Sequence, residues 1–293
     1  MSKYSQYVEN LKDELSKELK IVIDSCNYSN VLKQSMSYTL LNHGKMFRGT
    51  LLLALLDDLS GDYKAGINAA TAIEMIHAYG LIHDDMPALD DARFRRNKLA
   101  NHLVYGEAQA MLAGDALQAE AFGLVASTPA KSDVVLKLIS LLSRASGANG
   151  YVGGQSLDII SEHEDLEEID SEMIKKIHYG KTGALIEAAV LSAAYLGEVD
   201  SSKLEVLKVI AYHVGLAFQI RDDILDVTKA ANETGKDARS DIKKDKTTYP
   251  KLFGVDKSIV KFQNHLNKSL DLIGSLIGNN SHTSTLVKEM LTL

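Results

Sequence analysis

The sequence has little of several residue types, and each scarcity narrows the kind of protein that it can encode. Its 293 residues include one cysteine, three prolines and no tryptophan. The single cysteine, Cys26, excludes an intrachain disulfide and a zinc site built from several cysteines, and it agrees with a reducing cytoplasm. Because prolines interrupt helices, their scarcity leaves long stretches in which helices can run unbroken.

An excess of positive charge and long apolar runs are also absent. The net charge is −7 and no Lys/Arg tract is present, so nucleic acid is not an expected partner. No apolar run approaches the roughly 18 residues that a transmembrane helix needs. Residues 1–20 are charged and amphipathic, without the apolar centre of a signal peptide. We therefore expect a cytoplasmic protein with no transmembrane segment.

Helical spacing dominates what is present. Val8, Leu11, Leu15, Leu19 and Val22 recur at intervals of three and four, which is typical of an amphipathic helix. The same kind of pattern predicts further helices over residues 46–59, 65–84, 105–127, 133–148, 171–179, 181–196, 202–228, 257–277 and 284–291. No convincing series of alternating strands appears, and no linker divides the chain. The prediction is one all-α domain over residues 1–293.

Two segments rich in aspartate follow apolar helical stretches. The first contains Asp84, Asp85, Asp90 and Asp91, and Pro87 places its first two acids at the end of a helix. A helix C-terminus disfavours anions, so a purely structural role is poorly supported there. Two unit charges about 4 Å apart repel by roughly 4 kcal/mol at an effective dielectric constant of about 20. Such acids are expected to attract a cation.

The second segment contains Asp222, Asp223 and Asp226. On a helix, Asp222 and Asp226 share one face and Asp223 is turned away from it by about 100°. Carboxylate oxygens without soft ligands suit Mg²⁺, which usually bridges a few carboxylates to substrate phosphates. Basic residues placed near such a site then suit a diphosphate. They are Lys45, Arg48, Arg95, Arg96, Lys181, Lys236 and Lys246.

Residues 229–248 are polar and lack apolar periodicity, directly after the second acid segment. A long polar loop beside a site indicates either a lid that orders on ligand binding or a solvated linker. The sequence leaves both interpretations open. A second loop is expected at residues 87–99. The pair Gly153-Gly154 indicates either a tight turn or, with Gln155 and Asp158 after it, a break in helical structure beside the site, and we favour the break.

Taken in order, these motifs resemble the trans-isoprenyl diphosphate synthase family, and specifically its bacterial farnesyl diphosphate synthase (geranyltranstransferase) group. The likeness extends from about Gly44 to Leu252 in one order and spacing. The segments that carry the resemblance are Ile76 to Asp91 with Arg95-Arg96, Gly153-Gly154-Gln155 with Asp158, Lys181-Thr182-Gly183, Gln219 with Asp222 to Asp226, Gly235-Lys236-Asp237 and Lys246 to Pro250. The resemblance implies a single polyprenyl synthetase domain with helices around a deep central apolar cavity.

It also implies a homodimer that uses three Mg²⁺ per active site, with Mn²⁺ able to substitute. By likeness, the metal ligands are Asp84, Asp90 and Asp222, with Asp85 and Asp226 in or near the coordination shell. The allylic diphosphate, from dimethylallyl or geranyl diphosphate, would be held by Arg95, Lys181 and Lys236. Isopentenyl diphosphate would be held by Lys45, Arg48, His77 and Arg96. Thr182 and Gln219 would face the allylic carbon that becomes cationic.

The chain departs from the family pattern at a few positions. Met46 stands where a basic residue is usual, Ala92 and Arg93 stand where further acids are common, and Asn97 replaces a common glycine. These residues lie outside the main ligand set. We expect altered loop charge and no loss of metal binding.

The implied activity is farnesyl diphosphate synthesis. Alternatives are a geranyl or geranylgeranyl diphosphate synthase, a terpene cyclase, and a catalytically silent binding or regulatory homologue. A cyclase would not need a second diphosphate site, and a silent copy would need neither the acids nor the cations. In the resembling family, the residues one turn before the first acid segment form the floor of the product pocket. Here they are the bulky Tyr79, which we expect to be the barrier, and Gly80, which we expect to leave space.

Overall fold

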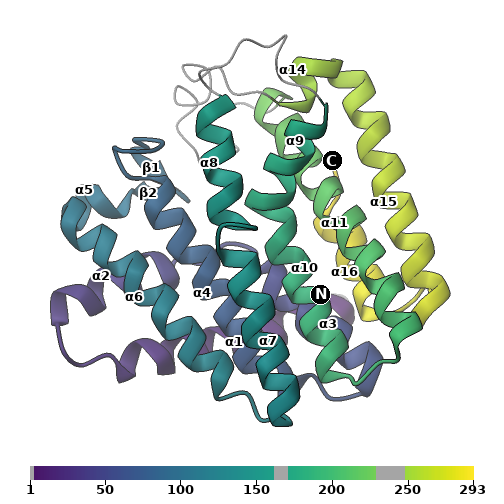
Figure 1. The fold of residues 1–293 in the computed structure, drawn as a ribbon, viewed down its shortest axis with the longest axis horizontal. Helices are drawn as coiled ribbons and strands as arrows, with labels where there is room; N and C mark the ends of the chain where they lie inside the picture. The colour runs from purple at the N-terminus through teal and green to yellow at the C-terminus, as the bar shows by residue number, and fades with distance from the viewer. Residues whose placement is uncertain (1–2, 162–170, 229–247) are drawn as a thin grey trace.

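The computed structural model describes residues 3–161, 171–228 and 248–293, and the chain in these ranges is almost entirely helical (Figure 1). The elements follow in the order α1 (Lys3–Ser25), α2 (Asn30–Leu40), α3 (Phe47–Ser60), η1 (Tyr63–Gly66), α4 (Ile67–Asp84), β1 (Phe94–Arg95), β2 (Lys98–Leu99), α5 (Asn101–Tyr105), α6 (Glu107–Ala126), α7 (Ser132–Ser146), α8 (Tyr151–Ser161), α9 (Ser171–His178), η2 (Tyr179–Gly183), α10 (Ala184–Leu196), α11 (Ser201–Thr228), α14 (Tyr249–Phe253), α15 (Val255–Ile277) and α16 (His282–Met290). The predicted all-α fold class is confirmed.

The core is built around helices that are buried on nearly every side. α4 and α10 are mostly apolar and have buried residues on nearly every side, because neighbouring helices surround them. α4 packs most extensively against α6, α10 packs against α3, α7 and α11, and α11 packs against α15. The outer helix α1 presents the predicted stripe, with Leu11, Leu15 and Leu19 fully buried. No helix in the described ranges has both the length and the apolar content needed to cross a membrane.

Two of the longer helices, as well as the short α5 and α14, were not expected from the sequence. α2 has a polar composition, and it begins where Ser29 accepts a hydrogen bond from the Leu32 amide at 3.3 Å. A cap of this kind stabilises a helix by about 1 kcal/mol. The other helix, α8, contains Gly153 and Gly154, so the predicted break at this pair is wrong. Gly154 instead permits close packing, since a Cβ there would lie 2.7 Å from Gly180 Cα.

The helix ends that carry the two acid segments lie at the same end of the molecule. α4 and α11 both finish in the upper part of Figure 1, close to the β1–β2 hairpin and to α14 respectively. η2, a single π-helical turn, lies between α9 and α10 and packs against both α8 and α11. The fold therefore brings four separate stretches of sequence to one region: the ends of α4 and α11, together with α8 and η2. The deep central cavity expected from the sequence stays a prediction.

Candidate active site

The first acid segment folds back over the end of α4. The amide of Asp90 donates to the carbonyl oxygen of Asp84 at 2.9 Å, and the amide of Ala92 donates to that of Asp85 at 3.1 Å. These bonds satisfy carbonyls that the helix end would leave without partners. They also return Asp90 to the neighbourhood of Asp84. Two of the predicted metal ligands are thereby brought together by the backbone itself.

The two oxygens of the Asp84 carboxylate have different surroundings. Tyr151 donates its hydroxyl to Oδ2 at 2.5 Å, whereas Oδ1 is buried with no hydrogen-bond partner. Burial raises the pKa of Asp84; the positive charge of Lys181 and the hydrogen bond from Tyr151 oppose this effect, and Asp90 adds to it. A buried polar atom without a partner is costly and is rare in proteins. Oδ1 is therefore placed to receive a ligand such as a cation.

The donor set agrees with Mg²⁺. Among the residues that the structure describes, no three Asp, Glu, His or Cys side chains stand close enough together to hold a metal ion by themselves. Mg²⁺ does not require this, because it is usually held by one or two carboxylates and completed by substrate phosphates and water. The unpartnered Oδ1 of Asp84, with Asp90 nearby, meets that requirement.

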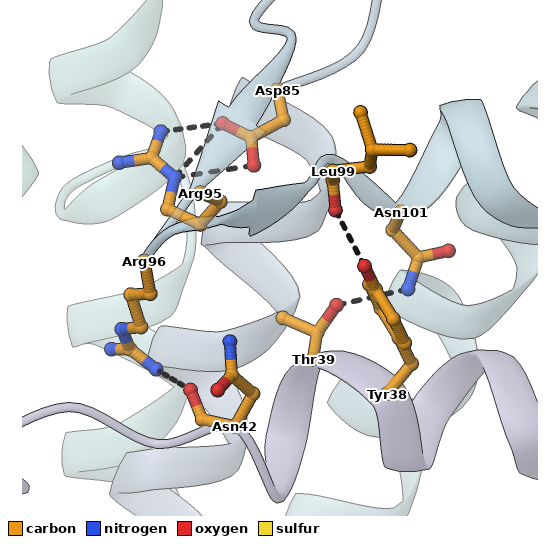
Figure 2. A pocket seen from close by; sticks show the side chains of 8 residues that line it. All are labelled: Tyr38, Thr39, Asn42, Asp85, Arg95, Arg96, Leu99 and Asn101. Carbon is orange, nitrogen blue, oxygen red and sulfur yellow. Dashed lines mark hydrogen bonds and ion pairs between the residues drawn. The ribbon is translucent and has the colours of Figure 1, made fainter. Parts of the chain in front are cut away.

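Asp85, the neighbouring acid, is engaged differently. Asp85 is 2% exposed and accepts hydrogen bonds from Arg95 (Figure 2). Arg95 Nη2 lies 2.5 Å from Asp85 Oδ1, and Arg95 Nε lies 3.0 Å from the same oxygen. Burial raises the pKa of Asp85, and Arg95 opposes that rise. The pocket beside this pair has a volume of about 10 Å³, room for about one water molecule. Arg95, predicted to hold the allylic diphosphate, is thus occupied by Asp85 in this structure.

The β1–β2 hairpin directs the next arginine elsewhere. Arg95 pairs with Lys98 across a two-residue turn in which Arg96 and Asn97 have φ values of 52° and 62°. Positive φ at both positions is typical of a type I′ turn, and asparagine adopts this conformation readily. Asn97 therefore replaces glycine without distorting the turn. Arg96 leaves the hairpin on the opposite side from Asp85 and donates to the Asn42 carbonyl at 2.8 Å (Figure 2).

Three of the four residues predicted to hold isopentenyl diphosphate come together. Burial depresses the pKa of His77 far below its ordinary value, and the charges of Arg48, Arg96 and Arg95 depress it further. Arg48 is buried, and its Nε has no hydrogen-bond partner. A buried guanidinium nitrogen of this kind is suited to an anion. Lys45, the fourth residue, is exposed just before the start of α3.

The predicted Lys181 lies on η2 and pairs with Asp158 of α8. Its charge also lowers the pKa of Asp84, so Lys181 lies near both acids. α8 and η2 are held at short range because neither Gly154 nor Gly180 carries a side chain. The close crossing of these two elements positions the Lys181 ammonium.

Thr182 and Gln219 are joined in a chain of hydrogen bonds that ends on Asp223. Thr182 Oγ1 donates to Gln219 Oε1 at 2.6 Å, and Gln219 Nε2 donates to Asp223 Oδ1 at 2.8 Å. The other Asp223 oxygen accepts from the Tyr249 amide at 3.0 Å and lies 3.4 Å from His178 Nε2. Asp223 is therefore committed to buried contacts inside the protein.

The helical phase of the second acid segment is as predicted. Asp223 is 4% exposed, whereas Asp222 is partly exposed and Asp226 is exposed on the face turned away from it. Arg221 Nη1 lies 3.2 Å from Asp222 Oδ1, and its Nε donates to the Thr292 carbonyl at 2.7 Å. Asp222 also contributes to the electrostatic environment of Arg48. The second acid segment therefore lies near the group of basic residues that contains Arg48.

The two residues expected to form the product floor lie on α4. Tyr79 is buried, with its ring edge-on to His83 and to Tyr151. The expectation that Gly80 leaves open space is wrong, because Tyr151 fills it: a Cβ on Gly80 would lie 2.5 Å from Tyr151 Cζ. Sequence reasoning missed Tyr151, since nothing in the local pattern of α8 connects it with Asp84. Lys236 and Lys246, and most of the 229–248 loop, lie outside the described residues.

An almost entirely helical fold with two acid segments and a nearby group of buried basic side chains is typical of proteins that bind anionic ligands through metal ions and arginines. The polyprenyl synthetase family model matches residues 29–290, and the chain belongs to this family. It is 42% identical over 256 residues to a farnesyl diphosphate synthase from Micrococcus luteus, covering 87% of each chain. It is 36% identical over 278 residues to a farnesyl diphosphate synthase from Bacillus subtilis, covering 94% of this chain and 93% of the relative.

A solved structure shows the same fold at lower identity. The crystal structure of a geranyltransferase from Helicobacter pylori, complexed with magnesium and isoprenyl diphosphate, has a TM-score of 0.84 and 28% identity, over 99% of this chain and 97% of the other. Family membership therefore extends to the arrangement of the helices.

Proposed function

We propose that this protein is a (2E,6E)-farnesyl diphosphate synthase that condenses isopentenyl diphosphate with dimethylallyl diphosphate and then with geranyl diphosphate. One observation carries the assignment. The Oδ1 of Asp84, in the first acid segment, and the Nε of Arg48, in the nearby basic group, are both buried and both lack a hydrogen-bond partner. The first suits a metal-bound diphosphate, and the second suits a separate diphosphate. The names of the Micrococcus and Bacillus relatives support the same activity.

Asp84, Asp90 and Asp222 would hold Mg²⁺, three ions per site, with Mn²⁺ able to substitute. The Helicobacter structure in complex with magnesium supports this choice of metal. When bound, Mg²⁺ supplies stabilisation of the negative charge that collects on the leaving diphosphate. Lys181 and Arg95 would add positive charge at the same diphosphate, which requires Arg95 to exchange its contact with Asp85. Lys236 is proposed to join them.

Arg48, His77, Arg96 and Lys45 would hold isopentenyl diphosphate. The low pKa of His77 keeps its imidazole neutral, so it would contribute a hydrogen bond without adding charge. The hydroxyl of Thr182 and the amide of Gln219 would present oxygen dipoles toward the allylic cation. Cleavage of the allylic C–O bond would leave diphosphate and the allylic cation. The double bond of isopentenyl diphosphate would attack that cation to form the new C–C bond, and the released diphosphate would take the proton that the resulting cation loses. Apolar walls exclude water that would otherwise quench the cation.

A homodimer is part of the proposal. Leu103 and Val104 on α5, with Met111 and Leu112 on α6, are each between 44% and 50% exposed in the single chain. Neighbouring apolar side chains exposed to this extent mark surfaces that associate. Light scattering after size exclusion gives the oligomeric state, and a monomeric wild type would contradict this part of the proposal.

The activity is tested by product analysis with labelled isopentenyl diphosphate and each allylic starter in turn. A C15 diphosphate is expected from dimethylallyl and from geranyl diphosphate. Product made by the wild type after full chelation would contradict the metal assignment, and no condensation at all would favour a silent homologue. Asp84→Asn should lower turnover by at least about a hundredfold, since it removes a charge that the metal needs. The control is Asp91→Asn, at an exposed acid in the same loop.

A further inference from the structure

The ring of Tyr151 occupies the place where a side chain on Gly80 would stand. An added Cβ on Gly80 would lie 2.5 Å from Tyr151 Cζ and 2.6 Å from its Oη. Heavy atoms do not pack this closely, so Gly80 and Tyr151 can coexist only because Gly80 has no side chain. The ring is 7% exposed and meets Tyr79 edge-on, with the ring centroids 6.0 Å apart. Tyr151 and Tyr79 together form an aromatic wall one turn before Asp84.

The hydroxyl of the same residue holds the acid. Tyr151 Oη donates to Asp84 Oδ2 at 2.5 Å, and this bond leaves Oδ1 as the carboxylate oxygen without a partner. A hydrogen bond to one oxygen fixes the rotation of the carboxylate and therefore the direction in which the other oxygen points. One side chain thus contacts both the acid and the wall below it.

Tyr151 is also placed by a rigid part of the fold. It is the first residue of α8, which packs against η2 through the close approach of Gly154 to Gly180. η2 carries Lys181 and Thr182, so the tyrosine and these two residues are positioned by the same crossing. The position of the ring against α4 is therefore set together with the site and does not depend on a surface loop.

From this geometry we infer that Tyr151 is a specificity-determining and positioning residue of the chain. Its ring limits the length of the product by closing the space beside Gly80, and its hydroxyl orients Asp84 for the cation. The inference rests on the proposed function. It separates two properties of one side chain, which two substitutions can test independently.

Tyr151→Phe keeps the ring and removes the hydroxyl. The Mg²⁺ concentration for half-maximal activity should rise about tenfold, as expected for loss of one hydrogen bond to a charged group, with the C15 product retained. A second readout does not need turnover: the rise in Tm caused by Mg²⁺ with inorganic diphosphate should be smaller in this variant. Tyr151→Ala removes the ring as well, and its product should lengthen by at least one isoprene unit.

Tyr195, at the far end of α10, provides the matched controls Tyr195→Phe and Tyr195→Ala, which should change neither property. The packing of Tyr151 against Gly80 is checked by a double-mutant cycle in which Tm is measured. Gly80→Ala should lower Tm in the wild type and lower it much less in Tyr151→Ala, where the ring that it strikes is gone. Equal losses of Tm in both backgrounds would overturn the packing on which the inference depends.

An unchanged product length in Tyr151→Ala, or an unchanged response to Mg²⁺ in Tyr151→Phe, would overturn the corresponding part of the inference. These results differ from failure of the proposed function, which would appear as a wild-type enzyme that forms no prenyl diphosphate of any length.

Discussion

Thr182 on η2 donates its hydroxyl to the side-chain oxygen of Gln219 on α11, at 2.6 Å. Because the amide nitrogen of Gln219 donates in turn to Asp223, the amide has one orientation in which all its contacts are satisfied. The π-helical turn makes this possible, since it widens the helix locally and turns Lys181 and Thr182 toward the neighbouring elements. Two residues that the sequence assigned to the same role are therefore joined directly.

Replacing Thr182 by Val should lower kcat about tenfold with little change in either KM, because the Gln219 amide loses the bond that orients it. Steady-state kinetics with geranyl diphosphate would measure the split. Thr71→Val is the matched control: the Thr71 hydroxyl is buried without a partner, so its loss should leave kcat unchanged and Tm equal or higher. An unaltered kcat in Thr182→Val would remove the hydroxyl from the catalytic arrangement.

The two groups of cations should affect different substrates. Arg48→Ala should raise KM for isopentenyl diphosphate about tenfold or more, because a buried charged donor is lost. Lys181→Ala should lower kcat roughly a hundredfold, because the ammonium stabilises charge that develops on the allylic leaving group. Initial rates with each substrate varied in turn separate the effects.

Arg93→Ala, at an exposed arginine of the same loop as Arg95, is the control and should behave as the wild type. If Arg48→Ala and Lys181→Ala shifted the same constant alone, the division into two diphosphate sites would have to be abandoned.

Acid should destabilise the protein partly through His178. Burial lowers its pKa from 6.5 to about 3; the charge of Asp158 opposes this effect and the charge of Lys181 adds to it. Between these values the unfolded chain binds a proton that the folded chain does not, so the free energy of unfolding falls as the pH falls below 6.5. The slope for one such group is about 1.4 kcal/mol per pH unit, and the full stability is present above pH 6.5.

His178→Phe keeps a ring stacked on Tyr249 and removes the titrating group. Urea unfolding at pH 7.5, 6.0 and 5.0 should show a shallower loss of stability for this variant than for the wild type. His43→Gln, at an exposed histidine, should leave the wild-type slope intact. Parallel curves for the wild type and His178→Phe would show that this histidine does not report on folding.

How much could be predicted from the sequence depends on whether a feature is local. The helices that carry the acids follow from apolar spacing along one segment, and the separation of Asp223 from the face of Asp222 and Asp226 follows from helical phase alone. α8 could not be predicted in this way, because the role of Gly154 becomes clear only from its contact with Gly180. The contact of Tyr151 with Asp84 joins two helices distant in the chain, and no periodicity connects them.

The arginines show the same limit. Arg95 and Arg96 are adjacent in sequence and basic, so residue type alone places both near the acids, and only the family resemblance assigned them to different diphosphates. Their separation into a partner of Asp85 and a neighbour of His77 comes from the type I′ turn, because Arg95 lies in the strand before the turn and Arg96 is the first of its two left-handed residues. Residue type indicated the chemistry of the site, and backbone geometry decided which residue contacts which.

Tyr79 provides the last prediction, which concerns product length. It is buried within a single chain, against His83 and Tyr151, so a second subunit is not needed to cover it. Tyr79→Ala should open the wall from the α4 side and lengthen the product by at least one isoprene unit, which chromatography of the dephosphorylated products would show. Tyr79→Phe should retain the C15 product, because the ring and not the hydroxyl forms the barrier. A C15 product from Tyr79→Ala would leave Tyr151 as the residue to test for the floor.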